Sequence, residues 1–269
     1  MVTNRSRKIM KRRGRRNNKD TKEKFSSSNI ESLPNELLTE VVARVASCSF
    51  KSYINIKLSC KVFHEIAKER YVYQNATMAD FPIEPSWERN KQEKINKLTS
   101  FMELCRESGN TEALYRKGVK FACYCDQMDL FKNERTEVAK ELLKKAANGG
   151  HLGALYVIGI IMIFMGGDVK EKGVMLIGGM KKREPLRTIA RDCRKSLIEI
   201  LENIWVKNPH VLGQRPTRCT LQHQRSRTNG WSSWPPIDSD DEDADFHCDA
   251  CICDVEIAHV ISALPAYSY

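Results

Sequence analysis

The chain has 269 residues, enough for one or two domains, and its 29% of charged residues is typical of a soluble helical protein. Its formal net charge of +10 is concentrated at one end, where eleven lysines and arginines within the first two dozen positions face only Asp20 and Glu23. The remainder is nearly neutral, so the basic pI reflects the tail and is no evidence that the folded part binds nucleic acid.

Residues 1–28 form this basic tail, which ends in Ser26, Ser27 and Ser28. The tail has no apolar periodicity, and we expect it to be disordered. A basic run of this kind is typical of a nuclear-import signal, but it is also typical of a solvated tail. We expect a nuclear protein that is also present in the cytoplasm.

Residues 29–75 are predicted to form three short helices. Pro34 suits the first turn of a helix, and Glu36 suits the positive end of the helix dipole. Apolar residues then recur at helical spacing in three stripes. The stripes are Leu37, Leu38, Val41, Val42 and Val45; Phe50, Tyr53, Ile54 and Leu58; and Val62, Phe63, Ile66 and Ala67. Such a small module usually gains stability from a partner.

Residues 76–100 are predicted to be a linker that leads into a helix, because Pro82 and Pro85 restrict the backbone and the helix pattern starts near Ser86.

Residues 101–205 contain an internal repeat. Gly109–Gly118 is echoed by Gly150–Gly159, with Gly, Ala, Leu, Tyr and Gly recurring at a spacing of 41. A period of this length is typical of helical-repeat arrays, in which small residues allow neighbouring helices to approach closely. Partner helices are predicted at Glu137–Ala147 and at Lys172–Met180, where the glycines of the second weaken a helix. A further amphipathic helix is predicted at Arg187–Trp205.

The most apolar run, Leu152–Met165, has 14 residues and is too short to span a bilayer. We therefore expect a buried core helix and no membrane segment.

Residues 206–269 are predicted to be mostly irregular, with an acidic run at 238–245. Cys248, Cys251 and Cys253 follow, and two thiolates two residues apart can hold zinc from a tight turn. Candidates for completing such a site are Cys219, His223, His247 and His259. The alternative is a tail with free thiols. We take Cys248, Cys251, Cys253 and His259 as the zinc candidates and expect no other cofactor.

The stretch Leu33–Val45 resembles the opening of an F-box, with Leu-Pro followed by aliphatic residues on one helical face. Leu58–Ile66 resembles the second half of the same family, where a Ser-Cys-Lys step precedes an aromatic and an aliphatic residue. The segment between them, 46–53, lacks the Leu-Pro that usually ends the first helix. Residues 101–205 are similar to Sel-like and tetratricopeptide-like repeats, and this combination resembles a group of plant F-box proteins.

The resemblance implies a substrate-recruiting adaptor without catalytic residues, in a Skp–cullin–F-box ubiquitin ligase. The F-box would bind a Skp-type linker and through it a cullin, and the repeats or the tail would bind an unknown protein substrate. The implied linker contacts are Leu33, Pro34, Leu37, Leu38, Val41, Val45, Ile54, Leu58, Val62 and Phe63.

The expected fold is all-α: a three-helix F-box module, then a short antiparallel helical-repeat array, with disordered basic N-terminal and acidic C-terminal segments. Two other hypotheses remain open. The chain could be a nuclear nucleic-acid-associated protein that uses the basic tail and a zinc knuckle, although Trp231 and Trp234 lie beside an acidic run that repels phosphate. It could also be a helical scaffold without linker binding.

Overall fold

The computed structural model describes residues 30, 33–81, 92–123, 134–182, 184–203 and 249–263, and the basic tail lies outside them. Each of the eleven elements in these residues is an α-helix, so the all-α prediction is confirmed. The chain divides into two compact units, 1–33 and 34–269. In the first, the Leu33 N–H donates a hydrogen bond of 3.2 Å to the Ile30 carbonyl.

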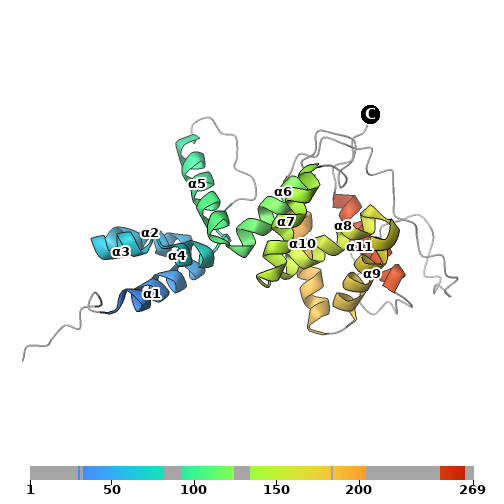
Figure 1. Cartoon of the computed structure of the whole chain (residues 1–269), viewed down its shortest axis with the longest axis horizontal. Coiled ribbons are helices and arrows are strands. Elements are labelled where there is room, and N and C mark those ends of the chain that lie inside the picture. Colours follow the sequence, from blue (N-terminus) through green and yellow to red (C-terminus); the bar gives the residue numbers. More distant parts are fainter. Residues whose placement is uncertain are drawn as a thin grey trace, which may run out of the picture. The chain divides into compact units, whose positions relative to one another are not determined.

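The second unit begins with four helices, one more than predicted (Figure 1). Glu69 adopts an extended conformation after the third helix and starts another. The four are α1 (Asn35–Cys48), α2 (Phe50–Ser59), α3 (Lys61–Ile66) and α4 (Arg70–Asn75).

The core of this region continues past the predicted boundary at residue 75. The ring of Phe101, in α5 (Gln92–Ser108), lies 4.9 Å from Phe50 and 5.4 Å from Phe81, measured between ring centroids. Cys105 and Ala113 are buried in the same cluster as α1. Residues 34–81, called the F-box segment below after their F-box-like sequence, therefore share one core with the helices that follow, because aromatic side chains from both are needed to fill it.

The predicted repeat forms two helix pairs, α6 (Thr111–Cys123) with α7 (Glu134–Asn148) and α8 (Leu152–Met165) with α9 (Gly167–Lys181). α10 (Leu186–Asn203) follows, and Figure 1 shows these helices packed together. The two predicted partner helices and the further amphipathic helix are confirmed as α7, α9 and α10.

The spacing of 41 residues corresponds to one recurring turn. Gly109 and Gly150 have φ of 92° and 90°, the left-handed region that glycine adopts without strain. At the first turn, Asn110 N–H donates to Cys105 O and Gly109 N–H donates to Arg106 O; His151 and Gly150 make the equivalent bonds at the second. This is the Schellman arrangement that ends a helix.

Gly118 and Gly159 allow the close approach that the sequence predicts within each pair. A Cβ atom built on Gly118 would lie 2.8 Å from Leu143 Cγ, and one on Gly159 would lie 2.8 Å from Ile177 Cδ1. The Leu143 and Ile177 side chains come from the partner helices, so each glycine marks a close contact of its pair.

The expectation of an irregular C-terminal segment is wrong for Asp249–Ala263, which form helix α11. Its Cys253, Ile257 and Val260 are buried in one cluster with the repeat helices, and Ile252 is buried as well. The helix is short and is stabilised by that packing, since isolated helices of this length are marginal in water. Within the described residues, the helices are all too short or too polar to cross a membrane.

Candidate partner-binding surface

The apolar residues of α1 are divided between the core and the surface. Leu38, Val42 and Ala46 are at most 1% exposed, and they recur every four residues on the face that meets the other helices. Leu37 is 53% exposed, and Pro34 on the same side of the helix is exposed as well. The apolar arc of α1 is therefore broader than its own core requires, and its outer part faces solvent.

Val41 and Val45 lie between these two faces and are half-buried. They continue the exposed row of Pro34 and Leu37 along α1 at helical spacing.

A second group of exposed apolar side chains lies where α2 meets α3. Leu58 is 73% exposed and Val62 is 37% exposed, while Ile54 is half-buried one turn before Leu58. The turn is fixed by Cys60, whose Sγ accepts a hydrogen bond from Phe63 N–H at 3.5 Å. Apolar side chains held in the open at a fixed turn are available to a partner.

Capping also fixes the junction between α1 and α2, where the sequence lacks the usual Leu-Pro. Ser49 is extended, and its Oγ accepts from Ser52 N–H at 3.3 Å. Tyr53 is buried behind this junction and donates from its hydroxyl to Ala67 O at 3.0 Å. Burial raises the pKa of Tyr53, which keeps the hydroxyl protonated as the donor.

Two of the predicted linker contacts lie in the core, and linker binding at these two positions stays a prediction. Leu38 and Phe63 are 1% and 8% exposed and belong to the core of the chain itself. A side chain that already fills the core has little surface left for a partner, so these two support the exposed residues from beneath. Leu33 belongs to the first unit and is 39% exposed.

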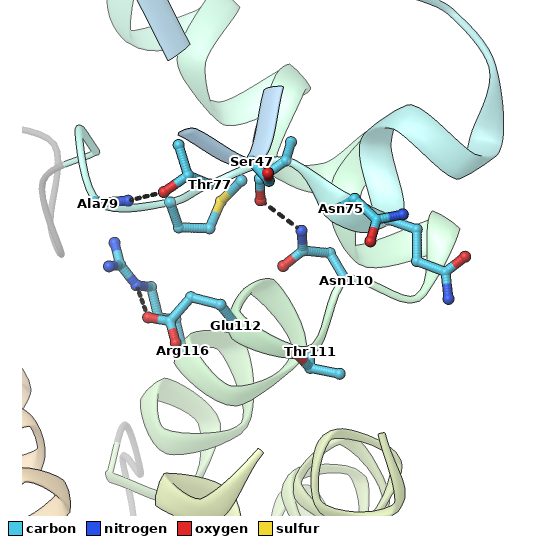
Figure 2. Close-up of a pocket in the computed structure, with 11 residues that line it drawn as sticks. Ser47, Asn75, Thr77, Ala79, Asn110, Thr111, Glu112 and Arg116 are labelled. Atoms are coloured by element: carbon cyan, nitrogen blue, oxygen red, sulfur yellow. Dashed lines mark hydrogen bonds and ion pairs between the residues drawn. The ribbon is translucent and has the colours of Figure 1, made fainter. Parts of the chain in front are cut away.

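A polar pocket of about 480 Å³ lies between the end of the F-box segment and the start of α6 (Figure 2). Asn110 Nδ2 donates to the carbonyls of Tyr73 and Ala76 at 3.1 and 2.8 Å, and its Oδ1 accepts from Ala113 N–H at 3.1 Å. Arg116 Nη1 donates to Phe81 O at 3.1 Å. The lining groups bind each other across the pocket, and we interpret it as the joint between the F-box segment and the repeats.

Glu112 is the charged centre of this joint. It accepts from Arg116 Nε at 2.6 Å and pairs with His151 Nε2 at 2.7 Å. Burial raises the pKa of Glu112, but the hydrogen bonds from His151 and Arg116 outweigh burial, and the pKa lies below its ordinary value. Glu112 therefore connects α6 to the turn before α8 as a carboxylate.

The zinc candidates are only partly described. Cys248 and the side chain of Cys251 lie outside the described residues. Cys253 is buried, and its Sγ lies 3.7 Å from Val174 O; His259 is half-buried. Cys251 and Cys253 are in a helix rather than a tight turn, and residues two apart on a helix do not face each other. Among the side chains that the structure describes, no three potential metal ligands lie together, and zinc binding stays a prediction.

The sequence reasoning missed the polar residues that hold the helices together. Asn110 and His151 each precede a helix and cap it, a position where Asn is common. Glu256 of α11, which pairs with Lys181 and Arg194, was missed because it lies in a segment that is irregular by the sequence prediction. The spacing of Ile252, Glu256 and Val260 at four residues was the available signal for a helix there.

Comparison with known proteins finds plant relatives. A family described as plant tetratrico peptide repeats matches residues 78–202. Two Arabidopsis thaliana proteins that carry F-box names, At1g67623 and At2g35280, are each 28% identical to the chain. The chain resembles plant F-box proteins with helical repeats.

The match to the first F-box relative covers 70% of the chain and 59% of that relative, so the chain spans less than two thirds of its length. The match to the second covers 56% of the chain and 84% of the relative. No solved structure matches the chain. The resemblance to plant F-box proteins predicted from residues 33–66 and from the repeat is confirmed.

Proposed function

We propose that the chain is the substrate-recruiting adaptor of a Skp–cullin–F-box ubiquitin ligase. The F-box segment binds a Skp-type linker, the linker binds a cullin, and the repeat helices bind the protein substrate. The adaptor acts by holding the substrate close to the transferred ubiquitin, which requires binding surfaces and no nucleophile.

The observation that carries the proposal is the exposed apolar surface of the F-box segment. Its most exposed members are Leu37 and Leu58, at 53% and 73%. Burying an aliphatic side chain contributes roughly 1.5–3 kcal/mol, so a few such residues provide useful affinity for an apolar partner. We define this set as the linker surface: Pro34, Leu37, Val41, Val45, Ile54, Leu58 and Val62.

The joint supports the second half of the proposal. An adaptor must keep its substrate at a defined place relative to the linker. The side chains of Asn110 and Arg116 bind backbone carbonyls of the F-box segment from α6, and Arg70 Nε donates to Ser108 O at 3.4 Å in the opposite direction. Bonds from both sides restrict rotation between the two regions.

The test is linker binding by the full chain, since a fragment that ends near residue 80 would lack Phe101 and Cys105 from its core. Leu37→Asp and Leu58→Asp should each weaken binding to a Skp-type linker at least about tenfold, which corresponds to roughly 1.4 kcal/mol. Met175→Asp is the matched control, because Met175 in α9 is 70% exposed and lies outside the linker surface. Equal affinity of all three variants and the wild type would refute the proposal.

We also propose that the basic tail directs the chain to the nucleus. Eleven basic side chains within two dozen residues support this reading. A fluorescent fusion of the full chain should accumulate in the nucleus and should spread to the cytoplasm when the tail's lysines and arginines are changed to glutamine. Unchanged distribution would leave the tail as a solvated segment.

A further inference from the structure

Helix α11 is held against the repeats by a buried carboxylate. Glu256 is fully buried, and its Oε1 accepts from Lys181 Nζ of α9 at 3.1 Å and from Arg194 Nη1 of α10 at 2.9 Å. Its Oε2 accepts from the Tyr156 hydroxyl of α8 at 2.6 Å. Burial and the carboxylate raise the pKa of Tyr156 well above its ordinary value, so the hydroxyl stays a donor. α8, α9 and α10 thus each provide one donor to the Glu256 carboxylate of α11.

A second carboxylate of α11 is recognised at its first turn. Asp249 Oδ1 lies 2.7 Å from Lys182 Nζ. Gly178 makes room for it, because a Cβ atom there would lie 2.7 Å from Asp249 Cγ and 2.9 Å from Asp249 Cβ. Asp249 and Glu256 are seven residues apart, about two helical turns, so both carboxylates lie on one face.

Apolar side chains fill the space between and after these acids. Ile252, Ile257 and Val260 are buried at 6%, 5% and 4% exposure. Together with the two acids they recur every three to four residues, the spacing at which an amphipathic helix presents its anchor residues to a groove. The repeat helices therefore recognise a definite pattern of two acids with aliphatic residues, rather than an apolar strip alone.

A long stretch of sequence separates α11 from α10. α10 ends at Asn203 and α11 begins at Asp249, with residues 204–248 between them. The match to the plant repeat family ends at residue 202, before this segment. The surface that receives α11 thus belongs to the repeats, whereas α11 itself comes from outside the part that defines them.

We propose that this surface of α8, α9 and α10 is a docking site for a protein helix that carries two carboxylates two turns apart with aliphatic residues between and after them, and that α11 is its resident occupant, which such a helix replaces. The inference rests on the proposed function in one respect, since the incoming helix is taken to belong to the substrate.

Charge determines which helix can replace α11. Lys181 and Arg194 are 11% and 15% exposed beneath α11, and a replacing helix without a carboxylate at the position of Glu256 would leave these two cations buried and unpaired. Leaving buried charges unpaired is strongly unfavourable. An incoming helix with an equivalent carboxylate removes that penalty, so the site selects acidic helices.

Hydrogen exchange on the wild-type full chain is the first test. The amides of α11 should exchange faster than those of α8, α9 and α10, through an opening that leaves the repeats folded. A synthetic peptide copying residues 247–264 should bind the chain and should increase exchange in α11. Exchange of α11 only together with α8–α10 would refute the proposal and make α11 a permanent part of the fold.

Variants of the full chain give the second test. Glu256→Gln weakens the resident helix and leaves the site intact, so the labelled peptide should bind this variant at least ten times more tightly than it binds the wild type. Adding Gly178→Ala should abolish this gain, and adding Gly179→Ala should not, because a Cβ atom on Gly179 meets nothing within 4 Å. No peptide binding by a folded Glu256→Gln chain would overturn the proposal. Linker binding by the same proteins tests the adaptor role separately.

Discussion

The closest approach between α8 and α9 provides a quantitative test of the packing. A Cβ atom on Gly173 would lie 2.7 Å from the Gly159 carbonyl oxygen and 2.9 Å from Met162 Cβ. Neither atom is the end of a flexible side chain, so α9 must move away from α8. Such overpacking usually destabilises by about 1–3 kcal/mol.

Helix propensity acts in the opposite direction. Replacing glycine by alanine inside a helix stabilises by about 0.8–1 kcal/mol, and this contribution is the same at Gly173 and at exposed Gly179 of the same helix. Gly173→Ala should therefore range from neutral to about 2 kcal/mol less stable than the wild type, whereas Gly179→Ala should be more stable by about 1 kcal/mol. The two variants should differ by roughly 1–3 kcal/mol.

The assay is urea and thermal unfolding of the full chain followed by circular dichroism of the helices. For a domain of this size, a difference of 1 kcal/mol shifts Tm by roughly 2–4 °C. Equal stability of the two alanine variants would show that α8 and α9 are farther apart than described and would refute the argument for Gly159 and Gly173 as the contact.

Three further predictions concern other parts of the chain. Leu38→Ala should destabilise the fold by about 2–5 kcal/mol, measured by urea unfolding, whereas Leu58→Ala should change stability by less than about 0.5 kcal/mol, since only Leu38 is buried. Because the pKa of Glu112 is lowered, its contribution to stability is present above the ordinary pKa of about 4.3 and is lost as the pH falls through the folded-state pKa. Glu112→Gln should therefore give a shallower loss of stability in acid, and an unchanged pH profile would contradict the assignment. Burial raises the pKa of the Cys105 thiol to about 12, so mass spectrometry after brief alkylation of the native chain should find exposed Cys48 modified and Cys105 protected.

Local patterns in the sequence were enough to place most helices. Apolar spacing located α7 and α10, and the spacing of 41 residues located the equivalent turns at Gly109 and Gly150. These features are determined by neighbours within a few residues, since a left-handed turn needs glycine and a helix face needs a period of 3.6.

The division of apolar residues between core and surface could not be obtained in this way. Leu37 and Leu38 are adjacent and chemically identical, yet one is 53% exposed and the other 1%. Which of them is buried depends on where α2, α3 and α4 lie around α1. The pattern along one helix does not contain that information.

The sequence by itself determined an all-α chain, an F-box-like opening, a repeated helix pair and a basic tail, because each follows from composition or from spacing along a single segment. Only the tertiary structure decided that Phe101 completes the F-box core, that Asn110 joins the two regions, and that Glu256 of α11 pairs with Lys181 and Arg194. These contacts join residues far apart in the chain, and their formation depends on the packing of whole helices rather than on the preference of any one of them.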